Sequence, residues 1–88
     1  MTSYRVTLRP AARRSLAKID PTISKRIIAA LDALAEDPRP PGVRALAGHH
    51  GWLRVRVGDW RVVYEVRDSE LYVLVIEIAH RREVYRGL

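Results

Sequence analysis

The first part of the chain changes from an alternating to a helical pattern of apolar positions. Apolar and polar residues alternate over residues 4–8, which is typical of a short strand with one buried face. Pro10 follows, and proline suits the first turn of a helix because no backbone N–H is required of it there. Ala12, Leu16 and Ile19 then form one apolar stripe. The pattern therefore predicts a strand followed by a first helix.

A second helix is the clearest element in the sequence. Asp20 is placed to cap it, and Pro21 occupies its first turn. The helix is expected to end at Asp37, because a residue that precedes proline avoids the helical region. Its apolar positions recur at helical spacing and mark a single face, formed by Ile23, Ile27, Leu31 and Leu34.

The second half of the chain predicts a sheet. A Pro/Gly-rich connection covers residues 38–51, and Leu46 is its expected anchor in the core. Three apolar runs follow, at residues 52–57, 60–67 and 71–79. Turn-forming pairs separate them, namely Gly58-Asp59 and Asp68-Ser69. The runs predict a three-stranded antiparallel meander, and the last run is apolar enough to favour a central position.

The order of these elements defines an α+β fold class. It consists of a strand, a two-helix hairpin, the three-stranded meander and a short basic C-terminal tail, with the helices packed on one sheet face. A chain of 88 residues has room for one domain, expected over residues 1–88. The start lacks the apolar run of a signal peptide, and no stretch approaches membrane-spanning length. A cytoplasmic protein without a membrane partner is expected.

The composition limits the available chemistry. There are no cysteines, which excludes disulfides, thiolate metal ligands and a thiol nucleophile. The sequence has no phosphate-cradling glycine loop and no HExxH motif. His49 and His50 lie in a glycine-flanked loop with no carboxylate or cysteine near them, so a metal site there is not expected. We expect neither a metal nor a small-molecule cofactor.

The charge of the chain points to an anionic partner. Lys and Arg number 16 against 10 Asp and Glu, which gives a net charge of +6 and a pI near 10.5. Such a domain attracts nucleic acid, an anionic surface or an acidic protein. Lys18 and Lys25 are the only lysines. Arginine suits bidentate phosphate contacts, although a GC-rich genome that favours arginine codons explains the bias equally well.

Three arginines are expected to meet on one sheet face. Arg54 and Arg56 share a face because side chains alternate along a strand. If Gly58-Asp59 is a two-residue turn, Arg56 lies opposite Arg61. Like charges in this position destabilise a sheet, so they either extend into solvent or surround an anion. Taken alone, Arg54 and Arg56 favour a solvated face, whereas Arg61 begins an otherwise apolar strand and is harder to explain in that way.

The basic tail adds residues that could move protons. His80 titrates near neutrality, so it could serve as an acid or base, or it could simply cap the end of the last strand. Tyr85 could act in catalysis or be a buried ring held by its hydroxyl group. Arg81 and Arg82 stand between them and supply further positive charge.

Two segments of the chain resemble the RelE/ParE superfamily, the toxins of bacterial toxin–antitoxin pairs. They are residues 46–66, which include the run from Trp52 to Tyr64, and residues 80–86, which close on an arginine–tyrosine motif. The resemblance extends over nearly the whole chain and favours the RelE-like branch. That branch cleaves messenger RNA in the ribosomal A site, whereas the ParE branch inhibits DNA gyrase and lacks the catalytic residues.

The resemblance implies a role for individual residues. Arg61 matches the arginine that contacts the scissile phosphate, and either Arg81 or Arg82 matches the arginine that assists the leaving oxygen. Tyr85 matches the tyrosine near the attacking sugar hydroxyl. Arg54 and Arg56 stand where well-studied members have lysines, and they are expected to bind RNA phosphates.

The replacement of lysine by arginine affects the choice of general base. Arginine stays protonated, so Arg54 and Arg56 can stabilise charge but cannot accept a proton. The base is then Tyr85, which we favour because neighbouring cations should lower its pKa, or His80.

The resemblance thus implies a metal-independent endoribonuclease in which a ribose 2′-hydroxyl attacks its own 3′-phosphate. The expected partners are the ribosome, messenger RNA and a RelB-like antitoxin with an acidic segment. Two alternatives remain. One is a ParE-like gyrase inhibitor without catalysis, and the other is a basic nucleic-acid-binding module that does not cut RNA.

Overall fold

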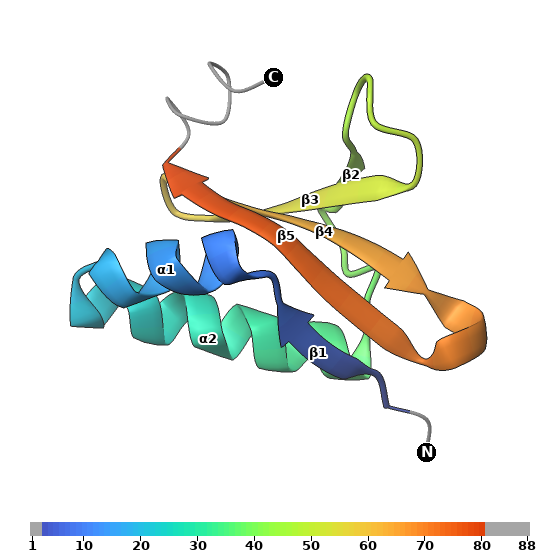
Figure 1. Ribbon diagram of the computed structural model, residues 1–88, viewed down its shortest axis with the longest axis horizontal. Coiled ribbons are helices and arrows are strands. Elements are labelled where there is room, and N and C mark those ends of the chain that lie inside the picture. The colour runs from blue at the N-terminus through green and yellow to red at the C-terminus, as the bar shows by residue number, and fades with distance from the viewer. Residues whose placement is uncertain (1–2, 81–88) are drawn as a thin grey trace.

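Two helices cover one face of a five-stranded sheet, in the arrangement that the sequence predicts for an α+β fold (Figure 1). The computed structural model describes residues 3–80. The helices are α1 (Pro10–Lys18) and α2 (Pro21–Glu36). The strands are β1 (Arg5–Leu8), β2 (Arg44–Ala45), β3 (Trp52–Val57), β4 (Trp60–Arg67) and β5 (Tyr72–His80), and η1 (Asp68–Glu70) is a turn of 3₁₀-helix.

The order of strands in the sheet is β1-β5-β4-β3-β2. The predicted meander is confirmed, because β3, β4 and β5 are consecutive antiparallel neighbours. The sheet is nevertheless mixed, since β1 lies parallel to β5 with Arg5 opposite Tyr72. The short strand β2 adds an edge beside β3 in the segment predicted as a plain connection. The apolar β5 is internal, as its composition predicts.

The predicted starts of both helices are confirmed. Proline stands in the first turn of each, and the side chain of Asp20 accepts a hydrogen bond of 2.9 Å from the backbone N–H of Thr22. The Asp20 cap satisfies one of the amides that a helix N-terminus leaves without an internal partner. Within residues 3–80, neither helix is long and apolar enough to cross a membrane.

The main core lies between the helices and the sheet. It contains the buried α2 residues Ile27, Leu31 and Leu34 together with the fully buried ring of Tyr64. A second, smaller cluster consists of Leu46, Val63 and Ile76, with Trp52 and Leu74 packed against it. Leu46 is therefore buried, as predicted, but in this second cluster rather than beneath the helices.

A shift in the pairing of β4 with β5 decides which residues reach the core. Val63 pairs with Glu77, but the next residue of β4 pairs with Val75, so Ile76 is the extra residue of a β-bulge. Strict alternation from Val75 would have pointed Glu77 toward the helices. Instead Ile78 joins the main core, and Glu77 shares the opposite face with Val63.

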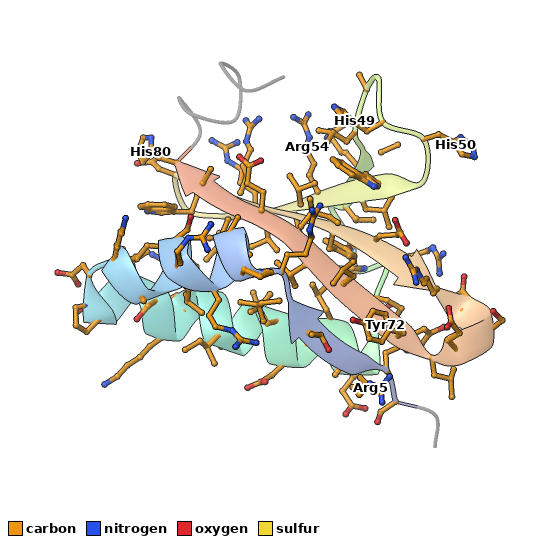
Figure 2. The ribbon with its side chains drawn as sticks, viewed as in Figure 1. Arg5, His49, His50, Arg54, Tyr72 and His80 are labelled. Carbon is orange, nitrogen blue, oxygen red and sulfur yellow. The ribbon has the colours of Figure 1, made fainter. Side chains whose placement is uncertain are left out.

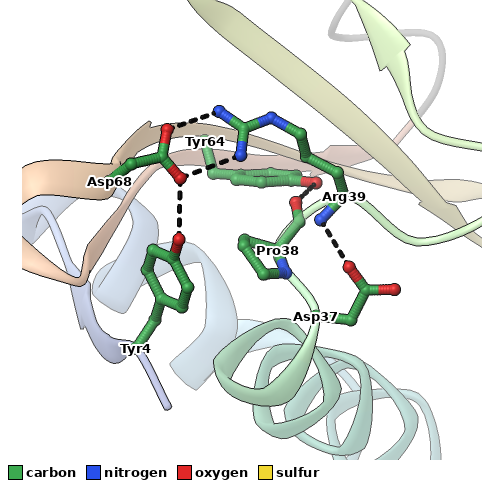
Figure 3. A network of polar contacts seen from close by, with 6 residues as sticks. All are labelled: Tyr4, Asp37, Pro38, Arg39, Tyr64 and Asp68. Carbon is green, nitrogen blue, oxygen red and sulfur yellow. Dashed lines mark hydrogen bonds and ion pairs between the residues drawn. The ribbon is translucent and has the colours of Figure 1, made fainter. Parts of the chain in front are cut away.

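A polar network holds the segment that follows α2 against the sheet (Figure 3). The Arg39 guanidinium binds the Asp68 carboxylate with both of its terminal nitrogens, at 3.0 and 2.9 Å, and the Tyr4 hydroxyl donates to the same carboxylate at 2.7 Å. The hydrogen bonds from Arg39 and then from Tyr4 lower the pKa of Asp68 to about 2. Beside them the buried Tyr64 hydroxyl donates to the Pro38 carbonyl at 2.7 Å.

Candidate functional site

The sheet face turned away from the helices carries an arginine-lined pocket. Arg56 pairs with Arg61 across the β3–β4 hairpin, as predicted from a two-residue turn, and Arg54 lies two residues before Arg56 on the same face. Together with Arg44, they line a cavity of about 90 Å³, to which Gly42 and Val55 also contribute. We call this site the arginine pocket. The side chain of Arg54 stands on this side of the sheet (Figure 2).

The hairpin geometry fixes the positions of Arg56 and Arg61. Gly58 has a φ of +61°, and a positive φ at the first central residue is the requirement of a type II′ turn, which matches the twist of the flanking strands. The Arg56 side chain donates from Nε to the Gly58 carbonyl at 3.3 Å. The turn thus sets the register that brings the two arginines together and also holds one of their side chains.

The four arginines differ in their exposure to solvent. Arg61 is buried, with 8% of its surface exposed, because β4 lies inside the sheet between β3 and β5. Arg54 is half-buried, and Arg44 and Arg56 are exposed. The pocket is thus lined by one buried arginine, one half-buried arginine and two exposed arginines. An anion that entered the pocket would lose part of its hydration shell and would gain contacts with several fixed guanidinium groups.

Arg44 belongs to the pocket but was missing from the sequence-based prediction. It pairs with Arg54 from the edge strand β2, and Gly42 precedes it at the wall of the cavity. A two-residue strand is too short to produce an alternating pattern, so the sequence predicted a loop there. The glycine is the signal that the sequence offered, since its φ of +88° is a backbone conformation that other residues rarely adopt.

The pocket is rich in cations. Within residues 3–80, the ion pairs of Arg39 with Asp68 and of Arg67 with Glu65 lie outside the pocket lining. The register places Glu77 on the same face as the pocket, two pairs along from the pair that joins Arg61 to Ala79. Among residues 3–80, the lining of the pocket includes four arginines and no carboxylate, so the described part of the site is positively charged.

Of the two residues that the sequence predicts to transfer protons, the structure describes His80 but not Tyr85. His80 pairs with Trp60, and its ring meets the Trp60 indole edge-on with centroids 5.5 Å apart (Figure 2). Trp60 packs against the main core, so alternation assigns His80 to the opposite face from Arg61. The structure therefore does not bring His80 into the arginine pocket. Arg81, Arg82 and Tyr85 lie outside the described residues.

The histidines of the β2–β3 loop have different surroundings. His49 stacks flat on Trp52, with ring centroids 4.5 Å apart and planes 7° from parallel, whereas His50 is exposed (Figure 2). This stack covers the second core cluster, to which Trp52 belongs. Among residues 3–80 no group of three or more histidine or acidic side chains is arranged to hold a metal ion.

Several solved toxin structures share this fold. A chain of the RelE–RelB complex from Pyrococcus horikoshii OT3 superimposes with a TM-score of 0.80 and 25% identity, covering 91% of this chain and 97% of that one. A chain of the complex RelBE2 from Mycobacterium tuberculosis gives a TM-score of 0.79 and 25% identity over 91% and 100%. For the intact RelBE complex of E. coli the identity is 22%, so the TM-score of 0.78 over 89% and 96% shows the fold alone. The class defined by this fold is that of small toxins from toxin–antitoxin pairs.

The family itself follows from the sequence. Residues 6–85 match the family described as "ParE toxin of type II toxin-antitoxin system, parDE", and the chain belongs to this family within the RelE/ParE superfamily. A curated relative, Toxin RelG from Mycobacterium tuberculosis, is 29% identical over 84 residues, which cover 94% of this chain and 97% of RelG. The family thus carries the ParE name, while this relative and the solved structures are RelE-like.

Proposed function

We propose that this toxin is a ribosome-dependent endoribonuclease that cuts messenger RNA and so stops translation. The observation that carries the proposal is the arginine pocket, a small cavity lined by the buried Arg61 and three further arginines. RNA cleavage through a phosphorane needs fixed positive charge where the phosphate oxygens gain negative charge. The similarity to RelG and to RelE-type toxins supports the same function.

The proposed reaction begins with attack by a ribose 2′-hydroxyl on the adjacent 3′-phosphorus. The new oxygen–phosphorus bond forms as the bond to the 5′-oxygen breaks, and the 2′-proton passes to a base while the leaving oxygen gains a proton. Arg61 binds the scissile phosphate, and Arg54 and Arg56 stabilise its charge from the neighbouring strand. In this proposal the arginines supply the charge that metal ions supply in two-metal nucleases, and the protein needs no metal of its own.

Tyr85 is the proposed general base. Because Arg54 and Arg56 cannot lose a proton, and because the register assigns His80 to the helix-covered face, the tyrosine is preferred over the histidine. Arg81 or Arg82 is proposed to assist the leaving oxygen. A weak base in the free protein agrees with a toxin that depends on the ribosome to align the reacting groups.

The proposed partners follow from charge and from the relatives. Solved RelE-like chains come from complexes with RelB antitoxins. We propose a RelB-like antitoxin for this chain, with an acidic segment that covers the arginine pocket and is attracted by the net charge of +6. The ribosome and messenger RNA are the proposed targets in the cytoplasm, and residues 1–88 are proposed to act as one domain.

A second candidate function is supported by the family description. The ParE branch of the superfamily inhibits DNA gyrase, as stated in the sequence analysis. This chain matches the family that bears the ParE name. A gyrase inhibitor without catalysis would tolerate replacement of Arg61, because no phosphorane would need stabilisation. Supercoiling by purified gyrase in the presence of the toxin distinguishes the two functions.

Mapping of messenger breaks tests the proposed function. The purified toxin is added to a translation reaction, and primer extension locates new 5′ ends along the messenger. We expect breaks within codons in the ribosomal A site, and none when ribosomes are left out. Intact messenger together with inhibited gyrase would contradict the proposal and favour the ParE-like function.

A further inference from the structure

A second pair of arginines meets at the β3–β4 turn, outside the arginine pocket. At this turn, the side chains of Arg56 from β3 and Arg26 from α2 both approach Gly58. Arg56 donates from Nε to the Gly58 carbonyl at 3.3 Å. The terminal nitrogens of Arg26 lie 3.6 and 3.7 Å from the position that a Cβ on Gly58 would occupy. Arg26 of α2 and Arg56 of the arginine pocket therefore both reach the same turn.

The Arg26 guanidinium has no described partner that would account for this position. Within residues 3–80 its side chain forms no hydrogen bond or ion pair, and it is exposed. Asp59 follows Gly58 in the turn, but no ion pair joins it to Arg26 or Arg56 in this part of the chain. Two exposed guanidinium groups beside one turn repel each other, and an anion bound between them would remove that repulsion.

We propose that Arg26 and Arg56 form a second phosphate-binding site at the β3–β4 turn, which holds the RNA backbone next to the arginine pocket. The inference rests on the proposed function and extends it, because it adds a contact on the side of α2. Arg56 takes part in both sites, because it lines the arginine pocket and its Nε also donates to the Gly58 carbonyl at the turn.

The site binds phosphodiester groups through charge and bidentate hydrogen bonds, without contact to the bases. It therefore adds affinity but no sequence preference. The phosphates could belong to the strand that is cut or to ribosomal RNA. Both sources offer the same chemistry, and both release counterions when a cation binds them.

The test compares the salt dependence of RNA binding for two matched variants. Arg26→Gln removes the charge at the turn, and Lys25→Gln removes one charge from the neighbouring exposed position on α2, whereas the atoms nearest to Gly58 belong to Arg26. A labelled single-stranded 2′-O-methyl oligonucleotide serves as an uncleavable probe, and its anisotropy gives the affinity over a salt series. Circular dichroism checks that both variants are folded.

We expect Arg26→Gln to reduce the slope of log affinity against log salt by about 0.7, the value for one phosphate contact to a single strand, with a smaller change for Lys25→Gln. Asp59→Asn should tighten binding, because it removes a negative charge from the turn. The same variants are assayed for binding to purified ribosomes. A reduced slope on the oligonucleotide assigns the site to the bound strand, and a reduced slope on ribosomes alone assigns it to ribosomal RNA.

Equal slopes for Arg26→Gln and Lys25→Gln on both probes would overturn the second site. The double variant Arg54→Gln with Arg56→Gln separates this failure from that of the proposed function. If the double variant flattens the salt dependence while Arg26→Gln does not, the pocket binds phosphate and only the second site is wrong. If neither has an effect, the arginine pocket itself does not bind RNA phosphates, and both inferences fail.

Discussion

The buried hydroxyl of Tyr64 tests how the fold holds Pro38, which follows α2 and precedes the pocket residues Gly42 and Arg44. Tyr64 is 0% exposed, and its hydroxyl donates to the carbonyl of the buried Pro38 at 2.7 Å. Tyr64→Phe keeps the ring in the core but leaves that carbonyl without this donor. A buried polar group that loses its partner costs about 1–3 kcal/mol. For a domain of this size, each kcal/mol lowers Tm by about 4–8 °C.

Thermal and urea unfolding of the folded variant measure this loss directly. Tyr72→Phe is the matched control, because within residues 3–80 its hydroxyl forms no hydrogen bond, although Arg5 lies 5.2 Å from the centre of its ring (Figure 2). We expect a clear fall in Tm for Tyr64→Phe and a much smaller change for Tyr72→Phe. Equal shifts in the two variants would refute the reasoning, because the bond to Pro38 would then contribute nothing.

The ionisation of Tyr64 gives an independent measurement of the burial of this hydroxyl. Burial raises the pKa of Tyr64 to about 12, from an ordinary value of 10.0. Since the folded-state pKa lies above the unfolded one, this contribution to stability is fully present below about pH 10 and is lost as the pH rises through about 12. Ultraviolet titration should show one tyrosine that ionises only near unfolding. That late component should be absent in Tyr64→Phe.

Four other variants test separate parts of the molecule. Gly58→Ala should destabilise the hairpin by about 1 kcal/mol, because a residue with a Cβ is strained at a φ of +61°, and thermal unfolding measures the loss. The lowered pKa of Asp68 means that its contribution is present above its ordinary value of 3.8 and is lost as the pH falls through about 2, so Asp68→Asn should flatten the acid side of the stability profile. Arg61→Ala should lower cleavage by about 100-fold or more while antitoxin binding persists, whereas full toxicity of a stably folded Arg61→Ala would favour gyrase as the target. Tyr85→Phe should likewise abolish growth arrest without loss of antitoxin binding.

The sequence predicted the parts of the site that depend on local pattern. The alternation along β3 and the Gly58-Asp59 turn together determine that Arg56 meets Arg61, and the structure confirms this pairing. The helices were predicted for the same reason, because their caps and apolar stripes are local signals. Local pattern and turn chemistry act over a few residues, and a sequence displays them directly.

The remaining features depend on contacts between distant segments. Arg44 enters the pocket through a two-residue strand that forms only because β3 lies beside it. Glu77 lies on the arginine face because of a β-bulge, and no residue of β5 predicts that bulge from the sequence. Arg26 meets Gly58 because α2 packs under the hairpin, although 32 residues separate them by the sequence numbering. No pattern within one element could have revealed these approaches.

End-group analysis on a modified messenger tests the proposed function most directly. Ribosomes are programmed with a messenger that carries a 2′-O-methyl group at the mapped cut site, beside an unmodified messenger and an Arg61→Ala control. If the 2′-hydroxyl is the nucleophile, the unmodified messenger yields a 2′,3′-cyclic phosphate and a 5′-hydroxyl, and the modified messenger stays intact. Primary products with 5′-phosphate ends, or undiminished cutting of the 2′-O-methyl messenger, would contradict the proposed mechanism.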